Sequence, residues 1–128
     1  MPVDVKMIQH SDYLEFVVTG SFDLNEAIKK FPDVLEACSH TRLDKVLIDY
    51  RKLQREDSAT IKAIYAYGIE DHYIKYLESG GHKLQFAYVG PVVMAWEPGM
   101  AVAEQGEWPF KLFDNLNDAL EWLGVKGA

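Results

Sequence analysis

The chain has 128 residues, of which 48% are hydrophobic and 26% are charged, and its formal net charge is -7. This composition excludes a largely disordered chain, and the length predicts a single domain over residues 1–128. A uniformly negative protein repels nucleic acids and anionic lipids, so we expect neither as a partner. We find no apolar run of about 20 residues that could span a membrane and no signal peptide, which predicts a cytoplasmic protein.

The cysteine and histidine residues form no metal-binding or nucleophile pattern. Cys38 is the only cysteine, which excludes an intrachain disulfide and a multi-cysteine metal site. The histidines, at positions 10, 40, 72 and 82, share no ligand spacing. Phosphate-binding loops, nucleophile elbows and zinc-protease motifs are also absent from the sequence. We therefore expect no cofactor, no metal and no enzymatic activity.

The first forty residues predict two strands and a helix. Apolar and polar residues alternate over 3–8 and again over 13–19, which predicts an antiparallel hairpin. Asp23 has the spacing of a helix cap, and apolar residues then recur every three or four positions as far as Cys38. Pro32 lies within this helix and lacks an amide hydrogen, so we expect a kink or a fresh start there.

The middle of the chain predicts a buried strand, a polar loop and a long helix. Residues 43–49 form a consecutive apolar run, which is typical of a strand covered on both faces. The helix that follows is expected from about Ser58 to about Glu78. Gly68 lies in mid-helix, where glycine costs about 1 kcal/mol relative to alanine, so we interpret it as a point of close packing.

The last third of the chain predicts five further elements. Asn115 has the position of a helix cap, and Gly124 has the position of a helix stop. The expected elements are a strand over 84–89, two short helical pieces around Pro98-Gly99 within 92–105, a strand over 110–113, and a helix over 116–123.

The order of these elements predicts an α/β fold. It is β-β-α-β-α-β-α-β-α, in which strands that alternate with helices are expected to be parallel. The first hairpin adds an antiparallel pair. The sequence therefore predicts a mixed five-stranded sheet with about four helices.

The junction between the 43–49 strand and the next helix is the first candidate site. Arg51 and Arg55 lie in the loop, and Asp57 and Ser58 begin the helix. A serine at this position usually caps the helix. Alternatively, Ser58 is a phosphorylation site, because a phosphate there would lie near the positive end of the helix and near Arg51 and Arg55.

A second candidate site consists of aromatic and apolar residues. Tyr65 lies on the long helix, and Trp96, Met100 and Trp108 lie around the Pro98-Gly99 break. They predict either ordinary core packing or a ligand pocket between the 58–78 helix and the 92–105 segment.

Residues 46–49, which end in Asp49 and are followed eight residues later by Asp57-Ser58, resemble the STAS domains. This family includes bacterial anti-sigma-factor antagonists and the cytoplasmic domains of sulfate transporters. Its helix begins Asp-Ser-Ser-Gly or Asp-Ser-Thr-Gly, and in the antagonists the first serine is phosphorylated. The resemblance implies that role for Ser58, although Ala59 and Thr60 stand where the second hydroxyl residue and the glycine belong.

The C-terminal half is similar to the SpoIIAA-like (STAS/SEC14-type) bacterial proteins. Their pattern is an apolar strand ending in Val-Gly, a strand ending in Phe-Asp, and an Ala-Leu-x-Trp-Leu helix. Residues 84–90, Phe113-Asp114 and residues 119–123 match this pattern. The resemblance implies the SpoIIAA-like version of the mixed five-stranded sheet.

Two hypotheses for the function follow. The first is a non-enzymatic, STAS-like regulatory module, similar to an anti-sigma-factor antagonist, which binds an unknown protein partner through loop 51–58 and the exposed side of the next helix. The alternative is a carrier of a small apolar, lipid-like molecule or a nucleotide in the pocket between 58–78 and 92–105. The sequence also leaves open a homodimer, formed through an exposed sheet edge or the broken segment.

Overall fold

The computed structural model describes residues 4–21, 24–53, 59–90 and 110–125. Their helices and strands are β1 (Asp4–Gln9), β2 (Leu14–Thr19), α1 (Leu24–Thr41), β3 (Lys45–Asp49), α2 (Ala59–Glu78), β4 (Gln85–Val89), β5 (Phe110–Phe113) and α4 (Leu116–Leu123). The helical pieces expected within 92–105 and the cap expected at Asp23 lie outside the described residues. Among the described helices, none has the length and hydropathy needed to cross a membrane.

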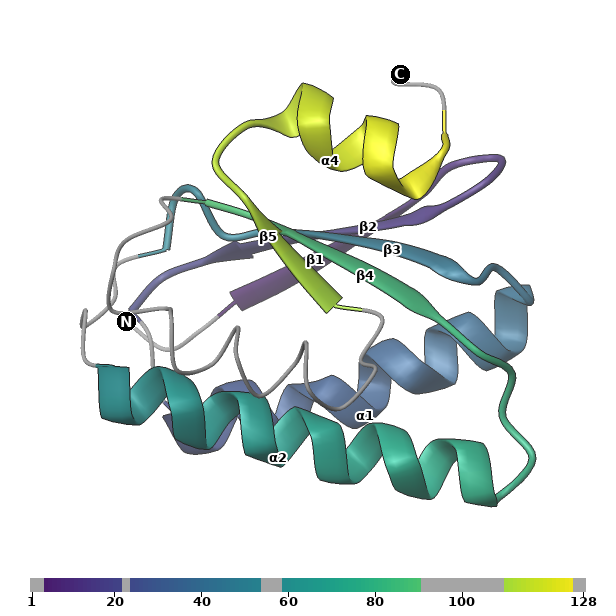
Figure 1. Ribbon diagram of the computed structural model, residues 1–128, viewed down its shortest axis with the longest axis horizontal. Coiled ribbons are helices and arrows are strands. Elements are labelled where there is room, and N and C mark those ends of the chain that lie inside the picture. Colours follow the sequence, from purple (N-terminus) through teal and green to yellow (C-terminus); the bar gives the residue numbers. More distant parts are fainter. Residues whose placement is uncertain (1–3, 22–23, 54–58, 91–109, 126–128) are drawn as a thin grey trace.

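The strands form one mixed five-stranded sheet in the order β1-β2-β3-β4-β5. Strand β1 is antiparallel to β2, and β2 to β5 are parallel to their neighbours. Successive crossovers in one direction place their helices on one face of the sheet. Figure 1 shows α1 and α2 on that face and α4 on the opposite face. The predicted mixed sheet is confirmed.

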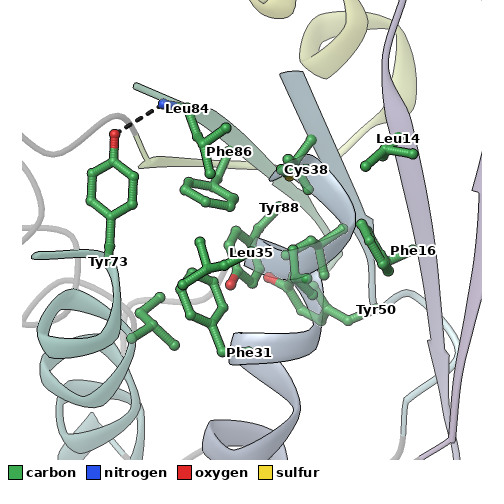
Figure 2. Close-up of a cluster of buried hydrophobic side chains, with 14 of the residues drawn as sticks. Leu14, Phe16, Phe31, Leu35, Cys38, Tyr50, Tyr73, Leu84, Phe86 and Tyr88 are labelled. Atoms are coloured by element: carbon green, nitrogen blue, oxygen red, sulfur yellow. Dashed lines mark hydrogen bonds between the residues drawn. The ribbon is translucent and has the colours of Figure 1, made fainter. Parts of the chain in front are cut away.

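The core on the α1 and α2 side is rich in aromatic side chains. Phe86 of β4 lies 5.4 Å from the ring of Phe31 and 5.8 Å from the ring of Tyr73, measured between centroids. Figure 2 shows side chains of α1, including Leu35 and Cys38, directed toward the same cluster. Such buried side chains contribute about 1.5–3 kcal/mol each to folding.

The core on the α4 side is built from smaller residues. Ala87 of β4 and Ala119 of α4 are fully buried, which lets the helix approach the sheet closely. Asn115 caps the helix, since its side chain accepts a 2.9 Å hydrogen bond from the amide of Asp118. Gly124 ends it with a φ of 73°, a conformation that favours glycine. Both predicted helix ends are confirmed.

Helix α1 continues through Pro32, so the fresh start expected there is wrong. Proline inside a helix costs about 3 kcal/mol. Buried residues on both sides of it, including Phe31, Leu35 and Cys38, pack against the sheet at helical spacing. A restart would move one half of this stripe off the sheet, and burial of several such side chains offsets the cost.

Two other interpretations of single residues are confirmed. A β-carbon at Gly68 would lie 2.8 Å from a side-chain carbon of Ile28, so this glycine marks the close contact of α2 with α1. Cys38 is fully buried, and burial raises the pKa of its thiol to about 12. A thiol with this pKa is a core residue and a poor nucleophile.

Candidate functional site at the carboxyl end of the sheet

The carboxyl end of β3 holds the part of the first candidate site that the structure describes. The strand ends at Asp49, and a short turn follows, closed by a 3.1 Å hydrogen bond from the amide of Leu53 to the carbonyl of Tyr50. Side chains alternate along a strand, so Asp49 points to the same face as Leu47, the α4 side. Asp49 is only 8% exposed.

Asp49 and Arg51 form a two-pronged ion pair. One carboxylate oxygen accepts hydrogen bonds from the Arg51 backbone amide at 3.1 Å and from Nε at 2.9 Å. The other oxygen accepts from Nη2 at 2.8 Å. The backbone contact two residues ahead is an Asx-type turn, which positions the loop as well as the guanidinium. The Arg51 side chain remains 48% exposed.

The protonation of this pair follows from its contacts. Burial acts to raise the pKa of Asp49, but the hydrogen bonds from Arg51 and the charges of Arg51 and Lys52 together hold that pKa below its usual value. The side-chain hydrogen bond with Asp49 raises the pKa of Arg51. The pair is therefore fully charged at neutral pH. A guanidinium has five N–H donors, and the Asp49 side chain takes only two of them.

Next to the ion pair, Tyr50 contacts Gly90, which directly follows the neighbouring strand β4. The amide of Tyr50 donates a 2.9 Å hydrogen bond to the carbonyl of Val89. The Tyr50 ring packs on Gly90 so closely that a β-carbon there would lie 2.3 Å from the ring. Neither residue was among the predicted site residues. The signal in the sequence was a glycine directly after an apolar strand, which marks close backbone approach.

All three described helices begin at this edge of the sheet. Helices α1, α2 and α4 directly follow β2, β3 and β5, whose carboxyl ends lie at one edge because these strands are parallel. A helix N-terminus carries a partial positive charge. Glu26 and Asp118 already lie in the first turns of α1 and α4, so the cations Arg51 and Lys52 share this edge with acidic side chains.

The structure tests only part of each predicted site. It places Asp49 and Arg51 together, whereas Arg55, Asp57 and Ser58 lie outside the described residues. Ala59 is the first residue of α2, close to the predicted start at Ser58.

The predicted aromatic pocket stays a prediction. Trp96, Met100 and Trp108 lie outside the described residues, and so does the side chain of Tyr65. In the described parts of the chain, no three histidine, cysteine, aspartate or glutamate side chains gather as a metal site would require.

No protein-family model and no curated protein sequence matches this chain. Solved structures do. An anti-sigma factor antagonist from Mycobacterium paratuberculosis has a TM-score of 0.59 at 16% identity, covering 96% of this chain and 95% of its own. The chain has the SpoIIAA-like fold. SpoIIAA itself, in its unphosphorylated form, has a TM-score of 0.54 at 11% identity, covering 98% of this chain and 100% of its own.

A third similar structure is an uncharacterised protein from Shewanella loihica PV-4, described as having a SpoIIAA-like fold. Its TM-score is 0.53 at 19% identity, and the match covers 94% of this chain and 93% of that one. The resemblance to the STAS and SpoIIAA-like proteins is thus confirmed for the fold.

Proposed function

We propose that this chain is a non-enzymatic regulatory module that acts in the cytoplasm as a single domain and binds an anti-sigma factor. The fold supports the proposal, since two proteins that share it are described as an anti-sigma factor antagonist and as SpoIIAA, also an anti-sigma factor antagonist. The contact surface is the turn after β3 together with the exposed side of the first turns of α2, which excludes the far end of that helix.

The Asp49–Arg51 pair is the observation that carries this proposal. Asp49 holds the Arg51 guanidinium in a fixed orientation, with N–H donors left for a second acceptor. A positioned arginine loses less conformational entropy on binding than a free one, which makes it an effective contact for a carboxylate. Nearby helix N-termini add to the attraction for an acidic partner surface.

Ser58 supplies the regulatory part of the proposal. It directly precedes Ala59, where α2 begins. A phosphate at this position would add about two negative charges at the helix start, close in sequence to Arg51, Arg55 and Asp57. We infer that phosphorylation of Ser58 would compete for the Arg51 guanidinium, repel an acidic partner surface and so weaken binding to the partner.

A binding assay tests the partner surface. The anti-sigma factors of the organism that encodes this chain are titrated against the wild type, Arg51→Ala and Lys75→Ala. Lys75 is a matched control, because it is an exposed cation near the far end of α2. We expect Arg51→Ala to weaken binding about tenfold or more, the equivalent of about 1.4 kcal/mol, and Lys75→Ala to leave it unchanged. Absence of binding by every anti-sigma factor, or equal loss in both variants, would refute the proposal.

The intact mass of the protein purified from its own host tests the switch. We expect a fraction with one added phosphate, which disappears in Ser58→Ala. Phosphate that persists in this variant would place the modification elsewhere and contradict the role of Ser58.

A further inference from the structure

Strand β1 has an open outer edge. It is the first strand in the sheet order, and no other strand in the described ranges pairs with its outer side. Its six residues pair with β2 without a bulge, and the strand contains no proline. Soluble proteins usually protect an edge of this length, because its free peptide groups can pair with another strand.

The hairpin geometry shows which peptide groups face outward. The amide of His10 donates a 2.9 Å hydrogen bond to the carbonyl of Tyr13, so this pair closes the hairpin. Hydrogen-bonded pairs alternate along an antiparallel ladder. The peptide groups of Lys6 and Ile8 therefore face β2, and those of Val5 and Met7 face outward.

An apolar groove lies beside this edge. It measures about 220 Å³ and lies between β1 and α1; we call it the β1–α1 groove. Lys30 and Asp33 contribute charges to it, and its apolar lining consists of Val5, Met7, Phe16, Val34 and Ala37. Met7 is 48% exposed and is one of two large hydrophobic side chains exposed to this extent among the described residues.

We propose that a second copy of this chain occupies the edge and the groove, with its β1 antiparallel to the first across a two-fold axis. An axis near Lys6 pairs the outward peptide groups of Val5 with those of Met7 from the second copy. The same register brings the Val5 and Met7 side chains together over the two grooves, so that each copy covers the exposed Met7 of the other.

The charges around the groove are self-complementary. Lys30 and Asp33 lie about one turn apart on α1, and the two-fold axis reverses the direction of the helix in the second copy. Lys30 of each copy therefore lies toward Asp33 of the other copy, so that opposite charges face each other. Within the strand, Asp4 lies diagonal to Lys6 of the second copy, which offsets the approach of the two Lys6 side chains. A strand of an unrelated protein could form the backbone hydrogen bonds with β1 but not these charge pairs, which favours a second copy as the partner.

The mass of the purified protein, measured by light scattering over about a hundredfold range of concentration, tests the proposal. Physiological ionic strength is needed, because two copies of net charge -7 repel each other at low salt. We expect a monomer that converts to a dimer as concentration rises. Met7→Lys should raise the dissociation constant about tenfold or more, because it places a charge in the apolar contact.

Ile74→Lys is the matched control. Ile74 is the other exposed large hydrophobic residue and lies on α2, with 45% of its surface exposed. This variant should dimerise like the wild type. A monomer at all concentrations would overturn the proposal, as would equal effects of Met7→Lys and Ile74→Lys.

A covalent test checks the register independently of affinity. Lys6→Cys should form an intermolecular disulfide under mild oxidation, since non-hydrogen-bonded residues opposite each other in an antiparallel pair are close enough. Lys111→Cys, on β5 at the other edge, should not. The native Cys38 is buried and does not compete. Equal cross-linking of both variants, or of neither, would contradict the arrangement.

Discussion

The two ends of the parallel strands are built differently. At the amino end, two side chains donate to the carbonyl end of α4: Lys45 Nζ to the carbonyl of Leu123, and Gln85 Nε2 to that of Trp122 at 3.1 Å. At the carboxyl end, where α1, α2 and α4 begin, Asp49 holds Arg51 in place and leaves it half-exposed.

The amino end also joins elements through a chain of internal hydrogen bonds. His82 Nδ1 lies 3.2 Å from the Tyr76 hydroxyl, and His82 Nε2 lies 3.2 Å from the carbonyl of Leu43. These bonds connect α2, β4 and the segment before β3. This difference supports the proposal that partner binding takes place at the carboxyl end, where binding sites are usual in α/β folds.

The largest expected effect concerns the close contact at the carboxyl end. Gly90→Ala should destabilise the protein by about 3 kcal/mol, because the new methyl group meets the buried Tyr50 ring. Gly80→Ala is a matched change at the amino end, where nothing lies within 4 Å. It should cost only about 1 kcal/mol, from its positive φ. Urea unfolding measures both, and equal losses would contradict the packing described for Gly90.

A somewhat smaller effect tests the amino end. The amide of Leu84 donates a 3.0 Å hydrogen bond to the Tyr73 hydroxyl, and this contact is buried (Figure 2). Tyr73→Phe leaves that amide without its partner and should cost about 2 kcal/mol. Tyr76→Phe removes a half-buried bond to His82 and should cost about 1 kcal/mol. Neither change should affect partner binding. If Tyr73→Phe weakened partner binding without changing the fold, the assignment of binding to the carboxyl end would be contradicted.

The Asp49–Arg51 pair predicts a pH dependence. The pKa of Asp49 is lowered in the folded state, so its contribution to stability is present above the unfolded pKa of about 3.9 and is lost as pH falls through the folded pKa. Arg51→Ala removes the side-chain hydrogen bonds and the guanidinium charge that lower this pKa, whereas the backbone hydrogen bond from residue 51 and the opposing effect of burial remain. The pKa of Asp49 is then less depressed, so the variant loses less stability from this group as pH falls. The stability difference between wild type and variant should therefore be largest near about pH 6 and shrink toward about pH 2. Urea midpoints over this range measure it, and a difference that does not change with pH would show that the pair does not form.

The smallest expected effect is a gain in stability at the amino end. Arg42 follows α1 with a φ of 60°, a conformation that favours glycine. Arg42→Gly should stabilise the protein by about 1 kcal/mol. Thermal unfolding measures the gain, and a loss would indicate that the Arg42 side chain makes contacts worth more than the relief of its backbone.

Most of the fold could be predicted because short-range patterns in the sequence determine where its strands and helices begin and end. Strand alternation, the Asn115 cap and the Gly124 stop depend on residues a few positions apart, and all of them appear in the structure. Of the two outcomes predicted at Pro32, the fresh start does not occur, because tertiary packing of the residues around it outweighs its low helix propensity.

The candidate site was only partly predictable, for a related reason. Asp49 and Arg51 were identified from their position after a buried strand, but their mutual bond depends on the turn conformation. The glycine after the 84–89 strand indicates a close contact at Gly90, but its partner Tyr50 lies forty residues away and cannot be identified from that local pattern. The open edge of β1 follows from the strand order, which the element sequence did not specify.

Hydrogen exchange in complex with the tightest-binding anti-sigma factor tests the central claim most directly. The account predicts slowed exchange at residues 50–53 and in the first turns of α2, with no change at residues 80–84 at the amino end. Protection confined to the amino end, or failure of any anti-sigma factor to protect the β3–α2 junction, would contradict the assignment of binding to the carboxyl end.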